Sequence, residues 1–321
     1  MPEWTLYFHG ACFDGLISGV LVRTFLESEK HSIRDFVPVN YELRKSWLSA
    51  PLKTPAAVVD FLYHPDAAFW ADHHSTAFLS IGARNDFLRR RSKTCLLYDD
   101  TSGSCASLLR NSLASRIPDG ERYREAVSWA EKIDTADYVS ADEAIWGDSP
   151  ALRIKQSLSL ENELSYYRLL LSEIRKGDLS GVAKLAPVAE RSDEVRRRIT
   201  AGYERARKDV HLNGTVAIMN VLLMKDDIVS RYVPYKVFPQ ARYSIGIVHC
   251  DGETRITAMR NPWIQFCSVP IGKILEPFGG GGHQRVGSVI LPEERAQLTP
   301  TIVDRLLAEM QSDSSAESVI A

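Results

Sequence analysis

The first half of the chain carries aspartates and histidines in four short groups. Carboxylate oxygens and imidazole nitrogens together are ligands that suit Mn²⁺ or a related divalent ion. The absence of a cysteine cluster argues against a structural zinc site. The residues considered for a divalent-metal centre are, in chain order, His9, Asp14, Asp60, Asp72, His73, His74 and Asp134.

Each group by itself has an ordinary explanation. An aspartate before a helix is often only an N-cap, and Asp14 could serve in that way. His9 could be an ordinary histidine with its hydrogen bonds satisfied. Together, however, the groups have a specific order, because His-x4-Asp-Gly, Val-Val-Asp, Asp-His-His and Asp-Thr-x-Asp follow one another along the chain. That order favours one functional site over four unrelated coincidences.

The segments around these groups alternate between strand and helix patterns. Helical patterns lie at 15–28, 76–91 and 103–115, and short apolar runs between them predict strands. This alternation predicts an α/β domain with a doubly wound, mostly parallel sheet, and ligands collect at the carboxyl ends of such strands. The predicted strands are 5–9, 33–39, 56–61, 67–71 and 94–98.

The pattern becomes helical from about residue 123 to 207, and strands return afterwards. The sequence therefore predicts a catalytic domain over 1–180, a helical linker over 181–212 and a smaller mixed α/β domain over 213–321, with a cleft between the domains. Strands are predicted in the last domain at 215–223, 229–236, 242–249 and 254–260, and helices near 270–276 and 301–310.

The overall composition is that of a globular protein without a strong charge. The chain has 321 residues, of which 45% are hydrophobic and 25% charged, and its net charge is −2. This balance disfavours wrapping of a long nucleic-acid duplex, although a local cationic pocket could bind a small anion. The five cysteines form no C-x-x-C pair. We expect a cytoplasmic protein without a signal peptide or membrane span.

The four groups resemble the motifs of DHH-superfamily phosphoesterases. The group contains RecJ-like exonucleases, nano-RNases, 3′-phosphoadenosine phosphate (pAp) phosphatases and cyclic-dinucleotide phosphodiesterases. The matching motifs are Phe8-His9-Gly10-Ala11-Cys12-Phe13-Asp14-Gly15, Val58-Val59-Asp60, Asp72-His73-His74 and Asp134-Thr135-Ala136-Asp137-Tyr138. Far downstream, Phe278-Gly279-Gly280-Gly281-Gly282-His283 is similar to the glycine-rich signature of the DHH-associated C-terminal domain.

The resemblance implies two metal ions bridged by Asp60. Mn²⁺ is the expected metal, with Mg²⁺, Fe²⁺ or Zn²⁺ as alternatives. Two such ions about 3.5–4 Å apart can clamp a phosphoryl oxygen and supply a metal-bound hydroxide that attacks phosphorus. The implied ligands of one ion are His9 and Asp60, and those of the other are Asp14, Asp60, His73 and Asp134.

Three further motif residues have other implied roles. By the same resemblance, His74 contacts the substrate phosphate or assists the leaving group, and Asp72 orients a neighbouring group. Cys12 stands where many family members carry the first aspartate of an Asp-x-Asp pair. Cys12 either ligates the first metal as a thiolate or is a small packed residue, and the sequence leaves both readings open.

The resemblance also implies that the second domain recognises the substrate. Consecutive glycines expose backbone N–H groups and let phosphate approach closely, although a glycine run could also be a flexible turn. Arg260 stands where the family places a phosphate-binding arginine, or it is an ordinary surface arginine. The predicted substrate-binding residues are Arg260, Gly280, Gly281, Gly282 and His283.

Together these inferences predict a metal-dependent hydrolase of the phosphodiesterase or exonuclease kind. The expected substrate is a nucleotide or a short single-stranded oligonucleotide, without a membrane partner, and a homodimer stays open. One alternative is a pyrophosphate or polyphosphate hydrolase, against which the glycine-rich signature speaks. Another is a non-catalytic nucleotide-binding regulator on the same scaffold, which only Cys12 favours.

Overall fold

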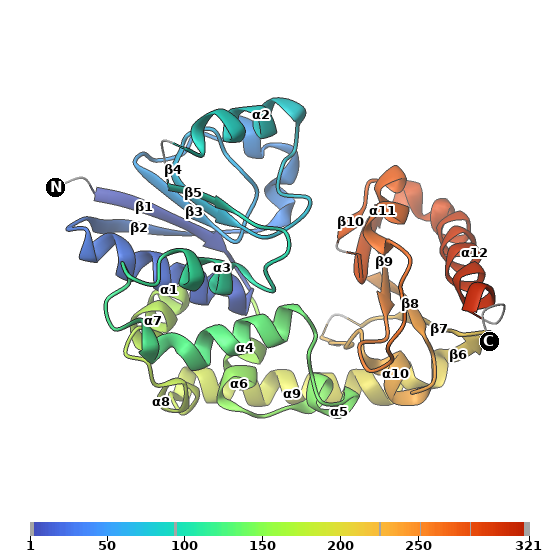
Figure 1. Cartoon of the computed structure of the whole chain (residues 1–321). Coiled ribbons are helices and arrows are strands. Elements are labelled where there is room, and N and C mark those ends of the chain that lie inside the picture. The colour runs from blue at the N-terminus through green and yellow to red at the C-terminus, as the bar shows by residue number, and fades with distance from the viewer. Residues whose placement is uncertain (1–2, 93–94, 225, 251, 283, 318–321) are drawn as a thin grey trace. The chain divides into compact units, whose positions relative to one another are not determined.

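The computed structural model describes residues 3–92, 95–224, 226–250, 252–282 and 284–317 (Figure 1). The chain forms two compact units, and each is discontinuous in sequence. The first unit consists of Met1–Asp137 and Asp148–Ser192, and the second of Tyr138–Gly147 and Asp193–Ala321. Residues 181–212, predicted as a linker, contain the long helix α9 (Ala186–Ala206), which is divided between the units.

The sheet of the first unit is entirely parallel. Its strands are β1 (Glu3–His9), β2 (Ser32–Val39), β3 (Ala56–Val59), β4 (Ala67–Asp72) and β5 (Cys95–Tyr98). They lie in the order β2-β1-β3-β4-β5. The chain moves outward from β1 to β2 and then returns past β1 to β3. Such a change of direction is where open α/β sheets bind ligands, outside the carboxyl ends of the strands.

Helices pack on both faces of this sheet (Figure 1). Several begin at a serine that caps the first turn, since Ser80, Ser104 and Ser149 each accept a hydrogen bond from a backbone N–H three residues on. Besides the first part of α9, the helices of this unit are α1 (Phe13–Ser28), α2 (Ile81–Arg90), α3 (Cys105–Ser112), α4 (Arg124–Asp134), α6 (Pro150–Ser157), α7 (Leu164–Ile174) and α8 (Leu179–Ala183).

Side chains of β1 contribute to the core on both faces of the sheet. Phe8 is fully buried and lies close to Gly19 of α1. Its neighbour Tyr7 packs on Trp47, in an apolar cluster to which α2 contributes Phe87. Burial of such aromatic side chains from both faces fixes β1, whose carboxyl end carries the first predicted ligand.

The sheet of the second unit is mixed. Its strands are β6 (Val210–Asn213), β7 (Val216–Leu222), β8 (Tyr243–Cys250), β9 (Glu253–Arg260), β10 (Gly281–Gly282) and β11 (Val286–Pro292). They lie in the order β10-β11-β9-β8-β7-β6, and only β7 and β8 pair in parallel among these described strands. The helices of this unit, besides the rest of α9, are α5 (Ala141–Trp146), α10 (Val233–Val237), α11 (Ile271–Leu275) and α12 (Thr299–Glu317).

Apolar residues of α12 close the core of the second unit. Ile302 and Leu306 are fully buried and belong to one cluster with Tyr243 and Ile256 of the sheet. The segment 138–147 joins this unit through Trp263, whose indole N–H donates to the carbonyl of Tyr138 at 2.6 Å. Within the described ranges, no helix combines the length and apolar content needed to cross a membrane.

The two sheets confirm the predicted fold class, a doubly wound parallel domain followed by a smaller mixed one. One predicted strand is wrong, because 229–232 is irregular and 233–236 belongs to α10. Pro234 lies in the first turn of that helix, where its fixed φ suits a helix and its missing N–H is no loss. Three strands, β6, β10 and β11, were not predicted. The helix predicted over 76–91 begins only after its cap, Ser80.

Candidate metal centre

The first ligand loop follows β1 and leads directly into α1. His9 is the last residue of β1, and α1 begins at Phe13, so Asp14 lies in the first helical turn rather than at the N-cap. Gly15 is required at the next position, because a Cβ there would lie 2.3 Å from the carbonyl oxygen of His9. The Asp-Gly pair of the motif therefore reflects the close approach of the helix to the strand.

Three loops at this edge of the sheet contain a non-glycine residue in the left-handed region. Ala11, Asp60 and Ala136 have φ values of 55°, 55° and 58°. Such a conformation costs about 1–3 kcal/mol and persists where the surroundings impose it, commonly at functional sites. Asp60 is itself a predicted ligand, and the other two lie within two residues of predicted ligands Cys12 and Asp134.

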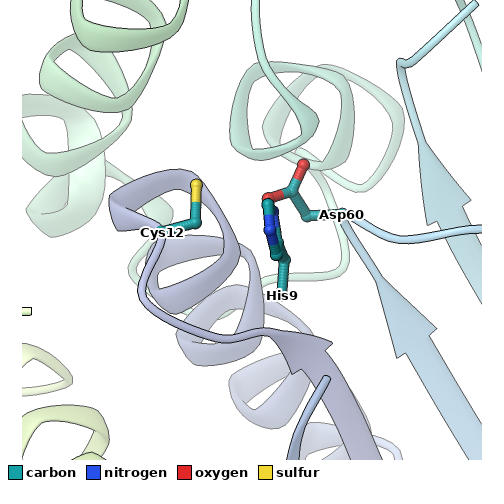
Figure 2. A group of neighbouring side chains, drawn as sticks. All are labelled: His9, Cys12 and Asp60. Atoms are coloured by element: carbon teal, nitrogen blue, oxygen red, sulfur yellow. The ribbon is translucent and has the colours of Figure 1, made fainter. Parts of the chain in front are cut away.

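His9, Cys12 and Asp60 converge from two loops (Figure 2). Nδ1 of His9 lies 3.3 Å from Oδ2 of Asp60. One ligand atom of each of the three side chains lies within 4.8 Å of the others. Asp60 is 1% exposed, whereas His9 and Cys12 are half-buried. The group could therefore offer one oxygen, one nitrogen and one sulfur atom to a single ion.

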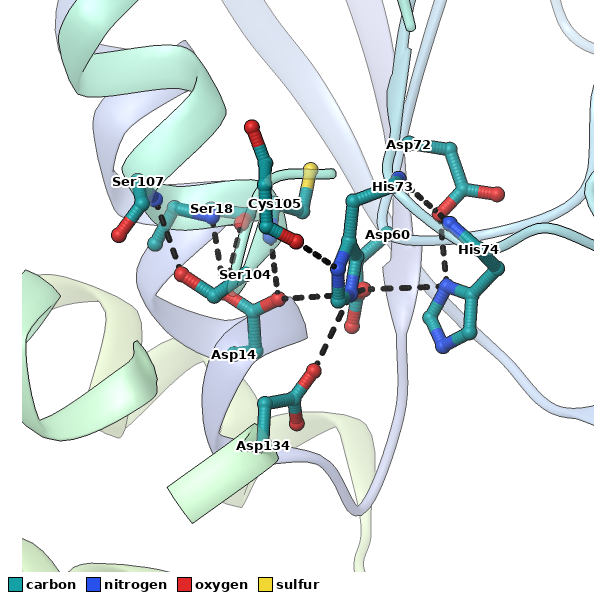
Figure 3. A network of polar contacts seen from close by, with 12 residues as sticks. Asp14, Ser18, Asp60, Asp72, His73, His74, Ser104, Cys105, Ser107 and Asp134 are labelled. Carbon is teal, nitrogen blue, oxygen red and sulfur yellow. Dashed lines mark hydrogen bonds and ion pairs between the residues drawn. The ribbon is translucent and has the colours of Figure 1, made fainter. Parts of the chain in front are cut away.

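A second group consists of Asp14, His73 and Asp134 (Figure 3). Nε2 of His73 lies 3.1 Å from Oδ2 of Asp134 and 3.7 Å from Oδ2 of Asp14. The same nitrogen lies 3.7 Å from Oδ1 of Asp60. Asp60 thus borders both groups, and oxygen atoms of three aspartates lie within 3.7 Å of Nε2 of His73.

Backbone groups hold the ligands of this second group in place. The N–H groups of Cys105 and Ala106, at the start of α3, donate to the Asp14 carboxylate at 2.7 and 2.9 Å. Nδ1 of His73 lies 3.1 Å from the carbonyl oxygen of Ser102. Because a carbonyl only accepts, Nδ1 must carry the proton, and Nε2 is the nitrogen that faces the carboxylates. Partners of this kind fix the orientation of metal-binding histidines.

Asp72 contacts both histidines of the third motif. Its Oδ1 lies 2.8 Å from Nδ1 of His74 and accepts a hydrogen bond from the backbone N–H of His73 at 2.8 Å. Asp72 is fully buried. Nδ1 of His74 also lies 3.8 Å from Oδ1 of Asp60. Asp72 is therefore suited to orient His74 rather than to bind an ion itself.

The surrounding charges shift the pKa values of the central groups. Burial by itself would raise the pKa of Asp60, but the hydrogen bond and charge of His9, with the charges of the two neighbouring histidines, lower it to about 2. Burial by itself would lower the pKa of His74, but the charge and hydrogen bond of Asp72 raise it to about 9. Without a bound cation, His74 is therefore positively charged at neutral pH.

The same forces act in the second group. Burial opposes the charge of His73, but the hydrogen bond to Asp134 and the charge of Asp14 raise its pKa to about 10. Burial, followed by the nearby Asp60 and Asp134 carboxylates, raises the pKa of Asp14 well above its usual value. Burial and the same carboxylates also raise the pKa of the Cys12 thiol. A divalent cation would replace the protons that balance this acidic cluster.

A buried oxygen atom of Asp60 supports the fit of a cation to this cluster. Oδ1 of Asp60 is buried and accepts no hydrogen bond within the described part of the chain. Buried carboxylate oxygens normally have a partner, so Asp60 Oδ1 leaves a position that a cation would satisfy. The oxygen and nitrogen donors suit a hard or borderline divalent ion, and the thiol of Cys12 adds softer character.

The predicted substrate-binding residues belong to the second unit. Arg260 is the last residue of β9, and Gly281 and Gly282 form β10, which pairs with β11. Gly280 has no room for a side chain, because a Cβ would lie 2.5 Å from the carbonyl oxygen of Ser288. His283 lies outside the described residues.

Two tyrosines contact the first ligand loop and its histidine, and neither was predicted. The hydroxyl of Tyr167, on α7, accepts a hydrogen bond from the N–H of Ala11 at 2.9 Å. The ring of Tyr41 stands edge-on to His9, with ring centres 5.2 Å apart and planes at 87°. Both reach the loop from distant segments of the chain, so no local motif indicates them. They help to fix the loop conformation.

The fold and this centre define a class of two-domain α/β proteins with candidate acidic and imidazole ligands at the carboxyl edge of a parallel sheet. Among solved structures, the chain is similar to the pGpG-specific phosphodiesterase PggH from Vibrio cholerae. The TM-score is 0.67 and the identity 15%, over 97% of this chain and 100% of the other. It is also similar to an exopolyphosphatase-related protein from Bacteroides fragilis, with a TM-score of 0.53 and 12% identity over 94% and 92% of the two chains.

These likenesses confirm the two-domain fold that the resemblance to DHH phosphoesterases predicted. No family model and no curated protein matches the sequence.

Proposed function

We propose that the chain is a divalent-metal-dependent phosphoesterase that hydrolyses a nucleotide or a short oligonucleotide. The observation that carries this proposal is the position of Nε2 of His73 within 3.7 Å of carboxylate oxygens from three aspartates. Such a concentration of buried acid groups is unfavourable without cations. The three aspartates are Asp14, Asp60 and Asp134.

The proposed first ion is held by His9, Cys12 and Asp60, and the proposed second ion by Asp14, Asp60, His73 and Asp134. When bound, a pair of divalent ions polarises a phosphoryl oxygen and makes a water nucleophile available at neutral pH. Asp60, which borders both groups, would hold both ions. Its left-handed backbone, with φ of 55°, supports a role in which the carboxylate must point in a set direction.

His74 is proposed to bind the substrate phosphate or to protonate the leaving oxygen. Its Nδ1 is engaged by Asp72 at 2.8 Å, so Nε2 is the nitrogen left to act on the substrate. The pair resembles other arrangements in which a buried carboxylate sets the tautomer of a catalytic imidazole. Asp72 is thus a positioning residue in this proposal.

Linear dinucleotides are the first substrates to test. The solved structure with a TM-score of 0.67 is a phosphodiesterase specific for pGpG, which supports that choice. A net charge of −2 also suits a small anion better than a long polymer. The exopolyphosphatase-related relative keeps pyrophosphate hydrolysis as the second candidate.

The deciding experiment is a hydrolysis panel with the full chain and Mn²⁺. It contains RNA and DNA of two to five nucleotides, 3′-phosphoadenosine phosphate, linear and cyclic dinucleotides, and pyrophosphate. We expect turnover of at least one nucleotide substrate, loss of turnover on chelation and recovery on adding Mn²⁺. Parallel tests with Mg²⁺, Fe²⁺ and Zn²⁺ identify the preferred ion.

The same panel separates the rival functions. Turnover of pyrophosphate alone would make the chain a pyrophosphatase. Tight nucleotide binding without turnover, under every metal tested, would make it a regulator. A cytoplasmic location is also part of the proposal, and fractionation of cells tests it. The oligomeric state stays open, and sedimentation of the purified chain determines it.

A further inference from the structure

The left-handed residues of the three loops at the ligand edge are held by two kinds of hydrogen bond. The N–H groups of Asp60 and Ala136 donate to main-chain carbonyls, at 2.9 and 3.3 Å. The N–H of Ala11 instead donates to a side chain, the hydroxyl of Tyr167, at 2.9 Å. In the first loop, a single hydroxyl group from a distant helix therefore takes the place that main chain has in the other two.

Packing on two elements sets the position of that hydroxyl. Tyr167 lies on α7 and is buried. Its ring stands edge-on to Phe8 of β1, with ring centres 5.4 Å apart and planes at 76°. One turn further along α7, the side chain of Leu171 lies 3.3 Å from where a Cβ of Gly19 in α1 would be. The strand and the helix that flank the first loop thus also hold the tyrosine in place.

Gly10 leaves room for the hydroxyl and ties the loop to β2. A Cβ at Gly10 would lie only 3.2 Å from Oη of Tyr167. The N–H of Gly10 donates to the carbonyl of Val39 at 2.8 Å. After Gly10, only Ala11 and Cys12 precede the start of α1. The backbone of Ala11 therefore decides where the Cys12 side chain points.

A left-handed alanine needs support from its surroundings. Its Cβ lies close to a carbonyl oxygen in that conformation, which glycine avoids and alanine does not. The hydrogen bond from Ala11 to Tyr167 offsets part of this cost. Without the hydroxyl, we expect Ala11 to leave the left-handed region more readily and to turn the Cys12 thiol away from its neighbours His9 and Asp60 (Figure 2).

We propose that Tyr167 is a positioning residue for the first proposed ion. Its hydroxyl holds Ala11 in the left-handed conformation, and that conformation directs the Cys12 thiol to the ion. This inference rests on the proposed function and deepens it, because it names a residue outside the motifs that governs one ion and not the other. The second ion is independent of this contact, since N–H groups of α3 hold its ligand Asp14.

Two neighbouring tyrosines of α7 provide the test. Tyr167→Phe removes the hydroxyl and keeps the ring that packs on Phe8. Tyr166→Phe is the matched control, because Tyr166 is also buried and its hydroxyl donates to Ser157 of α6 at 2.7 Å. Each variant thus loses one buried hydrogen bond, and only Tyr167→Phe loses a bond to the ligand loop. Circular dichroism should show that both variants fold.

Titration of the full chain with Mn²⁺ measures the two affinities. Tyr167→Phe should bind one ion about 10-fold more weakly than the native chain, in line with the loss of one hydrogen bond behind a ligand. The other ion should bind within about 3-fold of native affinity. Tyr166→Phe should keep both affinities. His9→Ala identifies the weakened ion, because Tyr167→Phe should have little further effect in that chain.

The absorption spectrum with Co²⁺ reports on the thiol itself. The native chain and Tyr166→Phe should show a sulfur-to-cobalt charge-transfer band, and Tyr167→Phe should show a weaker one. Adding Ala11→Gly to Tyr167→Phe should restore the band and the affinity for the first ion, since glycine adopts the left-handed conformation without help. Ala11 is exposed, so this change removes no buried contact.

Equal affinities for both ions in Tyr167→Phe and Tyr166→Phe would overturn the inference. A native Co²⁺ spectrum without a sulfur band would also overturn it, as would a loss in Tyr167→Phe that Ala11→Gly leaves unchanged. Failure of the proposed function looks different. In that case the native chain binds two ions and Tyr167→Phe weakens one of them, yet no substrate of the hydrolysis panel is turned over with any metal.

Discussion

The two units gather opposite charges by different sheet geometries. In the parallel sheet of the first unit, β1, β3 and β4 all end at the same edge, and acidic or imidazole side chains follow each of them. In the second unit, the antiparallel strands bring the end of β9 beside the starts of β8 and β11. Those positions carry Arg260, Arg242 and Arg285. In a parallel sheet, the carboxyl ends of the strands therefore lie together at one edge. In an antiparallel sheet, the end of one strand lies beside the starts of its neighbours.

This difference supports the proposal that the two units have separate tasks. Buried carboxylates and histidines of the first unit are suited to hold cations, and the arginines of the second unit are suited to hold an anion. Changes in the first unit should therefore alter metal content. Changes in the second unit should alter substrate affinity and leave metal content as it is.

The largest effect is expected from Asp60→Asn. Asp60 borders both ligand groups, and an amide cannot bridge two cations as a carboxylate does. We expect kcat to fall by about 10³-fold or more, since the loss of even one electrostatic stabiliser costs about 10²–10³. Turnover with Mn²⁺, metal content and circular dichroism of the variant are measured together.

Asp66→Asn is the control for this variant, because Asp66 is in the same unit and its side chain is 63% exposed. It should retain turnover and metal content. Near-normal turnover of a folded Asp60→Asn chain would remove the bridging role and, with it, the two-ion centre.

A smaller effect is expected from Arg260→Ala in the second unit. Loss of its guanidinium should raise KM about 10- to 100-fold, with kcat falling as well if the residue also stabilises transition-state charge. Metal content should stay at the native value. His283→Ala, which the motif resemblance places in the same role, should behave alike. A fall in metal content at constant KM would contradict the separation of tasks between the units.

Two glycines offer a direct comparison of the units. Gly15→Ala places a Cβ 2.3 Å from the carbonyl oxygen of His9, and Gly280→Ala places one 2.5 Å from that of Ser288. Both substitutions should destabilise by about 1–3 kcal/mol, because backbone must shift to admit the methyl group. Only Gly15→Ala moves a ligand, so only it should weaken metal affinity, by about 10- to 100-fold.

Gly82→Ala serves as the control for both, since its nearest neighbour would be a serine hydroxyl at 3.6 Å. Thermal unfolding and metal titration of the three variants give the comparison. Equal losses of metal affinity in Gly15→Ala and Gly280→Ala would mean that the effect is one of general stability.

The residues of the candidate metal centre could be picked out from the sequence because they lie in short motifs. A turn that lets α1 pack against the end of β1 needs Gly15, and the ligands must follow strands in a fixed order. Their partners could not be predicted. The backbone N–H groups that hold Asp14 are contributed by the start of α3, which no pattern in the sequence connects to α1.

The second unit was harder to predict for physical reasons. Its β10 has only Gly281 and Gly282, which carry no apolar pattern. The apolar residues of 229–236 suggested a strand, but Pro234 and the surrounding turns favour a helix there. Segment 138–147 belongs to this unit through tertiary contacts alone, among them the 2.8 Å ion pair of Asp142 with Lys236. Long-range contacts of this kind leave no local trace.

The smallest effect is expected from Cys12→Ser. This variant distinguishes Cys12 as a metal ligand from Cys12 as a packed residue. The thiol lies within 4.8 Å of ligand atoms of His9 and Asp60, which supports a role as ligand, whereas its raised pKa keeps it protonated until a cation binds. As a ligand it binds as thiolate and gives the first site a tolerance for Zn²⁺ or Fe²⁺.

If Cys12 is a ligand, the native chain loaded with Co²⁺ should show a sulfur-to-cobalt charge-transfer absorption that Cys12→Ser lacks. The variant should also bind one ion about 10-fold more weakly and bind the other ion, whose ligands are unchanged, with native affinity.

Cys12→Asp should then preserve or improve activity with Mn²⁺, because carboxylate is the harder ligand. If Cys12 only packs, the serine variant should retain two ions and native turnover, and the aspartate should destabilise the loop by adding an unpaired charge to an already acidic cluster. Two results together would exclude Cys12 from the centre: no sulfur band in the spectrum of the Co²⁺-loaded native chain, and two bound ions per chain in Cys12→Ser. His9 and Asp60 would then remain as the proposed ligands of the first ion.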